Sequence, residues 1–146
     1  MRKFVLIIIG VLILFFNVSC IFNSRVYHWE FEQSYTEVKE IQIVEISYNN
    51  GQYNTSVLKD IDIAYAKDIF DDIENIIMRS YGPNVLTPHG IYIKIIFNSN
   101  DYDLIGVIEP RHYYFNDETG NMTDNISHSV IKNEEQFDKL INKYLE

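Results

Sequence analysis

Histidines and carboxylates are the side chains of this chain that could carry acid–base or metal chemistry. The four histidines lie far apart, and none has the H-E-x-x-H spacing of a zinc site. A shared site would have to be assembled by the fold. Scatter through the sequence is the simpler interpretation for His28, His89, His112 and His128.

The acidic residues suggest calcium chemistry at two places. Asp101-Tyr102-Asp103 begins like an EF-hand loop, but His112 stands at the twelfth place, where a bidentate Glu is required. The polar stretch 116–125 carries further carboxylates that could bind calcium loosely or could simply belong to a solvated loop; these are Asp117, Glu118 and Asp124. We expect no metal site and no cofactor.

Nucleophilic and nucleotide-binding motifs are missing from the sequence. There is no G-x-S-x-G elbow, no G-x-x-x-x-G-K-[ST] loop and no G-x-G-x-x-G. The single cysteine, Cys20, lies at the end of an apolar leader, which excludes a thiol nucleophile in the rest of the chain. The sequence therefore predicts a protein that is not an enzyme.

Cys20 follows Arg2-Lys3 and the apolar run 4–18. A positive end, an apolar segment and a small residue before a cysteine are what a lipoprotein peptidase requires, and Asn17-Val18-Ser19-Cys20 resembles the lipobox of bacterial lipoproteins. The resemblance implies that residues 1–19 are a cleaved signal peptide and that Cys20 carries a diacylglycerol. The mature chain would then be lipid-anchored at the extracytoplasmic face of the cell membrane.

Two other interpretations of the leader stay open. The first is an uncleaved single anchor, although the unbroken apolar run is shorter than the ~20 residues that span a bilayer. The second is an ordinary secretory signal cut after Ser19. All three place the remaining chain outside the cytoplasm.

The charge of the chain restricts its partners. Removing residues 1–19 takes away two of the twelve Lys and Arg residues and none of the twenty-one Asp and Glu residues, which leaves a formal charge of −11. Nucleic acid is excluded as a partner, because binding to phosphates needs clustered Lys and Arg. A cationic peptide, a cationic surface or a divalent cation is more compatible with this charge.

The first half of the expected domain combines strands with one long helix. Tyr27, Trp29 and Phe31 alternate with polar residues and should share one face of a strand, packed in the core or resting at the membrane surface. Residues 39–48 and 53–58 should form a hairpin around Asn50-Gly51, with a bulge or two-sided burial at Val44. From Asp62 the spacing of apolar residues predicts a helix that ends at Gly82.

The second half should return to strands. Residues 91–97 are intensely apolar and predict a central strand, followed by antiparallel strands over 102–109 and 111–115. The stretch 116–125 predicts an exposed loop, and 126–132 a last strand. Asn133 should cap a final helix, with Gln136 in the capping-box position.

This order of elements predicts an α+β fold with a single antiparallel sheet and two helices packed on one face. The expected organisation is a signal peptide over 1–19, a lipidated tether over 20–25 and one globular α+β domain over 26–146. The strand–turn–strand near residues 91–107 and the terminal Phe-x-x-Leu-Ile helix resemble small uncharacterised lipoproteins of low-GC bacteria. That resemblance implies location and approximate fold only.

Two groups of residues are candidates for a binding surface. Asp68, Asp71 and Asp72 give the long helix a negative outer face, which is either an ordinary solvated surface or a docking face for a cationic peptide. Arg111, Tyr113 and Tyr114 form a short aromatic strip of the kind that anchors interfaces.

The sequence favours a membrane-tethered, extracytoplasmic, non-enzymatic binding protein of unknown ligand, including the possibility of an immunity-type lipoprotein that sequesters a cationic toxin. The alternative is a structural or accessory subunit of a cell-envelope complex, which would bind an envelope protein through its sheet edge or aromatic strip.

Overall fold

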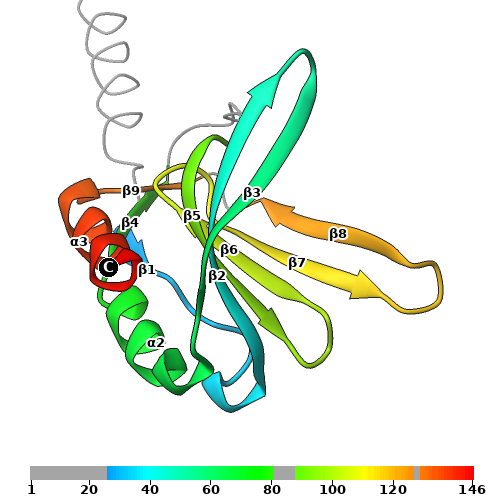
Figure 1. Ribbon diagram of the computed structural model, residues 1–146, viewed down its shortest axis with the longest axis horizontal. Helices are drawn as coiled ribbons and strands as arrows, with labels where there is room; N and C mark the ends of the chain where they lie inside the picture. Colours follow the sequence, from blue (N-terminus) through cyan, green and yellow to red (C-terminus); the bar gives the residue numbers. More distant parts are fainter. Residues whose placement is uncertain (1–25, 81–87, 127–128) are drawn as a thin grey trace, which may run out of the picture.

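The computed structural model describes residues 26–80, 88–126 and 129–146 (Figure 1). The expected signal peptide, the tether and Cys20 lie outside the described residues. The described elements, in chain order, are β1 (Val26–His28), the 3-10 helix η1 (Tyr35–Glu37), β2 (Val38–Asn49), β3 (Gln52–Ile61), the 3-10 helix η2 (Ile63–Tyr65), α2 (Ala66–Glu74), β4 (Ile77–Ser80), β5 (Gly90–Phe97), β6 (Tyr102–Gly106), β7 (Arg111–Asn116), β8 (Asn121–Ile126), β9 (Ser129–Ile131) and α3 (Glu134–Leu145).

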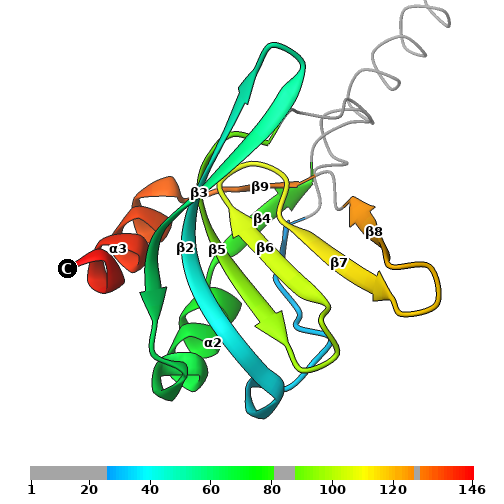
Figure 2. The ribbon, with the colours of Figure 1, turned by 45° about the vertical axis from the view of Figure 1, so that its right-hand side comes forward.

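The larger sheet has six antiparallel strands in the order β3-β2-β5-β6-β7-β8 and curls into a half-barrel (Figures 1 and 2). The predicted hairpin is confirmed, with Asn50 and Gly51 at positive φ of 52° and 81°, as a tight two-residue turn requires. The predicted irregularity at Val44 is a register shift between Ile43 and Val44. Strand β5 is central, between β2 and β6, as its apolar sequence predicts.

The expectation of a single-sheet α+β fold is wrong, because the structure is predominantly β and contains a second sheet. Three short strands form it in the order β1-β4-β9. They come from the start, the middle and the end of the described chain, and β1 and β9 have only three residues each. Such short segments carry almost no periodicity of their own, so only their mutual pairing defines the sheet.

The helix expected from Asp62 to Gly82 is much shorter. Asp62 does cap a helical start, since its side chain accepts a hydrogen bond from the Ala64 amide at 2.9 Å. However, α2 ends at Glu74, and Ile77 begins β4. Ile76 and Ile77 continue the helical spacing of the preceding isoleucines, although the helix has already ended before them and Ile77 belongs to a strand. Gly82 lies outside the described residues.

Two differences follow near the C-terminus. Part of the predicted loop 116–125 is strand β8, which pairs with β7 along its whole length. As an edge strand it needs no buried face, so it lacks the apolar alternation that identifies strands. Of the predicted strand 126–132, residues Ser129–Ile131 form β9. The predicted cap of the last helix is confirmed, because the Asn133 side chain accepts a hydrogen bond from the Gln136 amide.

The main core lies between one face of the six-stranded sheet, the two helices and the small sheet. It buries apolar residues of β2, β5, α2 and α3, and Trp29 is 3% exposed within it. Tyr27 and Phe31 pack against this core, so the three alternating aromatics of the first segment do serve core packing. Within the described ranges, no helix has the length and apolar character needed to cross a membrane.

Candidate functional site

The face of the six-stranded sheet opposite the helices carries a second, smaller apolar cluster. Its buried members come from three neighbouring strands, and two tyrosines pack against them: Val44, Ile46, Tyr92 and Leu104, with Tyr102 and Tyr113. Strand alternation produces this separation, since the inward residues of the same strands belong to the main core. The sheet therefore buries apolar residues on both of its faces.

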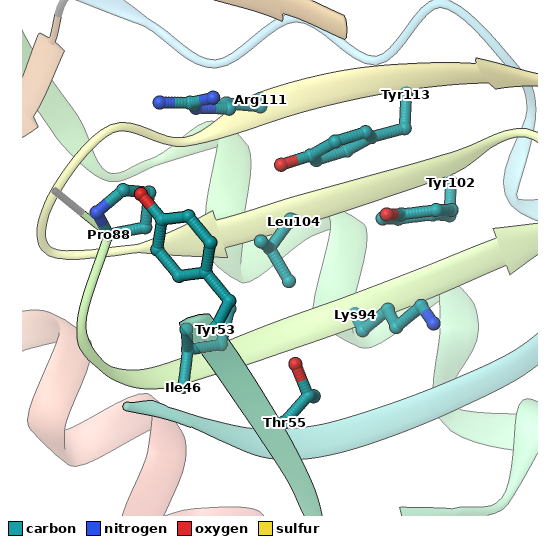
Figure 3. A pocket seen from close by; sticks show the side chains of 9 residues that line it. All are labelled: Ile46, Tyr53, Thr55, Pro88, Lys94, Tyr102, Leu104, Arg111 and Tyr113. Atoms are coloured by element: carbon teal, nitrogen blue, oxygen red, sulfur yellow. The ribbon is translucent and has the colours of Figure 1, made fainter. Parts of the chain in front are cut away.

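A groove lies over this second cluster, with a volume of about 250 Å³ (Figure 3). Its lining side chains come from strands β2, β3, β5, β6 and β7 and from the residue two positions before β5: Ile46, Tyr53, Thr55, Pro88, Lys94, Tyr102, Leu104, Arg111 and Tyr113. Leu104 and Ile46 form an apolar floor, and tyrosines stand on two sides. The groove therefore combines an apolar base with a small number of polar groups, as ligand sites do.

Tyr102 and Tyr113 form one wall of the groove as a stacked pair. Their ring centroids are 4.4 Å apart and their planes differ by 16°, and the hydroxyls of both rings point toward the middle of the groove in Figure 3. Burial raises the pKa of Tyr102 to about 12 and also raises the pKa of Tyr113. Both phenols consequently stay protonated at neutral pH and can donate hydrogen bonds to a bound molecule.

The opposite wall belongs to the β2–β3 hairpin. Tyr53 is 56% exposed and leans over the sheet from the edge strand, next to Thr55. Its ring contacts Tyr48 across the hairpin, with centroids 4.9 Å apart. A half-exposed aromatic ring on an edge strand has room to adjust its position over an occupant of the groove.

Lys94 is a half-buried cation that lines the groove, and its ammonium lies beside Tyr102 in Figure 3. Its Nζ lies 4.5 Å from the centroid of the Tyr102 ring, which is a favourable cation–π arrangement. Among the described residues, no carboxylate forms an ion pair with Lys94. Gln42, its partner across the β2–β5 pair, directs its amide to Glu40 and Asp60 instead.

Arg111, in contrast, is held by two carboxylates. Its guanidinium donates to Glu109 and, at 2.6 Å, to Asp124. Glu109 is completely buried and has a positive φ of 48°, a backbone conformation that costs roughly 1–2 kcal/mol for a residue with a side chain. Burial lowers the pKa of Arg111, but the hydrogen bonds to Glu109 and Asp124 outweigh it and raise the pKa. The Arg111 Nε is buried without a hydrogen-bond partner among the described residues.

A buried acid–imidazole pair lies on the other face of the same sheet. His112 Nδ1 is 2.6 Å from Asp103 Oδ1, and the His112 ring stacks on Trp29 with centroids 4.3 Å apart. Burial alone would lower the pKa of His112, but the hydrogen bond and the charge of Asp103 raise it above its ordinary value. Burial raises the pKa of Asp103, and His112 opposes that increase.

This pair is better suited to structure than to catalysis. The shallow pocket beside it is lined by residues 27–32 and His112, and none of these lining residues is a Ser, Thr or Cys that the imidazole could activate. Its contacts instead fasten the segment after β1 across the sheet. Tyr114 adds to this fastening, since its hydroxyl donates to Glu32 at 2.8 Å.

The structure separates the residues that the sequence grouped as a binding surface. Arg111 and Tyr113 line the groove, whereas Tyr114 points to the opposite face of the sheet. The three aspartates lie on α2, on the helix side of the molecule. Asp71 pairs with Lys67 and Asp72 pairs with Lys143, while Asp68 is exposed in the first turn of α2. Cys20 lies outside the described residues.

The groove contains residues that the sequence analysis missed, chiefly Lys94, Tyr102 and Tyr53. One signal was available, because Lys94 is the only charged residue in the otherwise apolar strand 91–97. A lysine in a central strand must point to a face where its charge is solvated or used. Its tyrosine neighbours could not be found in this way, because they come together only through the pairing of β5, β6 and β7.

No group of three or more His, Cys, Asp or Glu side chains that could hold a metal ion occurs in the part of the chain that the structure describes. In comparisons with known proteins, no family profile, curated protein or solved structure matches this chain.

Proposed function

We propose that this protein is a lipid-anchored, extracytoplasmic, non-enzymatic binding protein that holds a small ligand in the groove over Leu104. The observation that carries the proposal is the groove itself, in which an apolar floor, a stacked tyrosine pair and two cationic side chains lie on one face of the sheet. An apolar pocket with a few convergent polar groups is the usual form of a ligand site.

The geometry supports binding more than catalysis. The groove lining has tyrosines, one threonine and two cations, and Arg111 is already held by Glu109 and Asp124. None of the described lining residues is a carboxylate or an imidazole that could act as a general base near neutral pH. These groups can orient a ligand, donate hydrogen bonds to it and exclude water.

A fragment screen with a groove-filling variant tests this function. Thr55 is exposed on an edge strand, so Thr55→Trp should fold normally and place an indole in the groove. Ser56→Trp is the matched control, because the neighbouring residue on the same strand points to the opposite face. We expect fluorinated fragments that bind the full-length chain to lose binding in Thr55→Trp and to retain it in Ser56→Trp. A library with no fragment sensitive to Thr55→Trp would refute the proposal.

The membrane anchor is tested separately by mass spectrometry of the N-terminus of the protein purified from membranes. We expect a chain that begins at Cys20 and carries a diacylglycerol on its sulfur. An intact Met1 would instead support the uncleaved anchor, and an unmodified Cys20 at the new N-terminus would support an ordinary secretory signal.

The immunity-type form of the proposal would use the negative face of α2 rather than the groove. Two of the three aspartates of α2 form ion pairs with Lys67 and Lys143. These pairs are exposed and contribute little to stability, so a cationic peptide could displace the lysines. This form predicts binding of a cationic peptide such as polylysine at low salt and its loss when Asp68 and Asp71 are both changed to Asn. Unchanged binding in that variant would exclude α2 as the docking face.

The free edge of the larger sheet favours a second candidate function, an accessory subunit of an envelope complex. β3 lies at one margin of the sheet, and nine of its ten residues are exposed or half-exposed, including Val57 and Leu58. Such an edge can accept a strand from a partner. Crosslinking in intact cells should then yield a stoichiometric partner, and Leu58→Lys should abolish the crosslink.

A further inference from the structure

We propose that the ligand of the groove is a single-ring organic anion, whose carboxylate or phosphate pairs with the ammonium of Lys94 and whose ring packs on Leu104 and Ile46. This inference rests on the proposed function, since it names the ligand class of the same groove. It is supported by the charge of the side chains that line the groove, by the arrangement of its walls and by its volume.

The charges that line the groove are both positive. Lys94 and Arg111 are lining residues, whereas the carboxylates that hold Arg111, Glu109 and Asp124, are not. Arg111 is thereby paired with two carboxylates, and Lys94 is the lining cation that has no ion pair among the described residues. A cationic ligand would meet repulsion here, and an anionic group would complete the missing ion pair.

The acidic character of the whole chain does not oppose this assignment strongly. The formal charge is −9 for the whole chain and −11 without residues 1–19, and at physiological salt such charges are screened beyond about 8 Å. A pair formed with a half-buried ammonium that lines a groove is screened much less. The local cation should therefore decide the sign of the ligand.

The walls of the groove fit a ring. Tyr102 and Tyr113 present their edges and hydroxyls to the centre, and Tyr53 leans over from the opposite side. Leu104 and Ile46 beneath them form an apolar floor on which the face of a ring can lie. The hydroxyls of the tyrosines and of Thr55 can then form hydrogen bonds with polar substituents on that ring. A straight alkyl chain would leave these hydroxyls without partners.

The size of the groove favours a ligand with one ring. Its volume of about 250 Å³ is below the range of roughly 300–1,000 Å³ that is typical of sites for drug-sized ligands. A second ring or a peptide would extend out of the groove over exposed surface. A single ring with one charged group and one or two hydroxyls is compatible with this volume.

Three probes of one shape test the inference: 4-hydroxybenzoate, 4-hydroxybenzyl alcohol and 4-hydroxybenzylamine, which are anionic, neutral and cationic near neutral pH. Their affinities are measured by isothermal titration and saturation-transfer NMR with the full-length chain in phosphatidylcholine nanodiscs, with empty nanodiscs as the blank. We expect the anion to bind about tenfold more tightly than the neutral probe, which corresponds to about 1.4 kcal/mol, and the cation to bind most weakly.

Two matched variants assign the preference to Lys94. Lys94→Met keeps the aliphatic part of the side chain and removes the charge. It should therefore lower the affinity for the anionic probe about tenfold and leave the affinity for the neutral probe within twofold of wild type. Lys39→Met makes the same change at an exposed position of β2 and should alter neither.

The outcomes separate this inference from the function on which it rests. Equal or tighter binding of the cationic probe, or an equal effect of Lys94→Met on all three probes, would overturn the anionic assignment and leave the groove a ligand site. Failure of all three probes to bind would also overturn it. Whether the groove is a ligand site at all is then tested by the Thr55→Trp fragment screen, which assumes no ligand class.

Discussion

Replacing Gly106 by alanine should destabilise the chain through a direct collision with Tyr92. A Cβ at position 106 would lie 2.3 Å from Cδ1 and 2.4 Å from Cε1 of the Tyr92 ring. Carbon atoms pack at about 3.5–4.0 Å, so the ring would have to move by about 1 Å or more. Tyr92 is completely buried under the groove, which leaves it little room to move.

The cost has two parts. Forcing an extra carbon into a packed site usually costs about 1–3 kcal/mol. The Tyr92 hydroxyl also donates to the Ile108 carbonyl at 2.7 Å, and displacing the ring weakens a hydrogen bond worth about 0.5–1.5 kcal/mol. We therefore expect Gly106→Ala to lower the free energy of unfolding by about 2–4 kcal/mol.

Urea unfolding of the full-length chain, followed by circular dichroism, measures this change, and a double-mutant cycle with Tyr92→Ala identifies its cause. In the Tyr92→Ala background the added methyl group meets no ring, so most of the cost of Gly106→Ala should vanish. Gly120→Ala is the control, because Gly120 has a positive φ of 67° and nothing within 4 Å of its would-be Cβ. Its cost should be the same in both backgrounds. An equal cost of Gly106→Ala in both backgrounds would refute the collision.

Arg111→Met should destabilise the chain by about 3–5 kcal/mol, because the buried carboxylate of Glu109 loses its cation; urea unfolding should show most of this loss recovered when Glu109→Gln is added. His112→Gln tests the raised pKa of His112. Protonation of His112 stabilises the fold fully at pH values below the ordinary histidine pKa of about 6.5, and this stabilisation is lost as the pH rises through the higher pKa of the folded state. The gap in unfolding free energy between wild type and His112→Gln should therefore be larger at about pH 5.5 than at about pH 8.5, and an equal gap would show that Asp103 does not hold a charged imidazole. Asp68→Asn should leave the affinity for 4-hydroxybenzoate within twofold, because α2 lies on the other side of the sheet; titration showing a larger loss would connect the helix to the groove.

The elements that the sequence predicted correctly are those with strong local signals. Asn50-Gly51 is a turn because few other residue pairs tolerate two consecutive positive φ angles. The run 91–97 is a central strand because it is apolar enough to be covered on both faces. Asn133 caps the last helix through a hydrogen bond within a few residues. Each of these depends on neighbours in the sequence, which are visible without a structure.

The errors arose where distant segments decide the structure. Ile77 continues a helical spacing, but its place in β4 is set by pairing with β1 at His28, and the neighbouring Met78 pairs with Ile131 of β9. β8 is polar because it is an edge strand, so no periodicity indicated it. The groove was only half predicted for the same reason. The residue types of Arg111 and Tyr113 indicate a binding surface, but Lys94 lies beside them only because β6 lies between β5 and β7.

The stack of Trp29 on His112 gives the protein an internal optical sensor. Trp29 is the only tryptophan of the chain, and its indole lies flat against the imidazole that Asp103 holds. A protonated imidazole in contact with an indole quenches its fluorescence by electron transfer, whereas a neutral one does so weakly. We therefore expect the emission of the unmodified protein to follow the proton on His112.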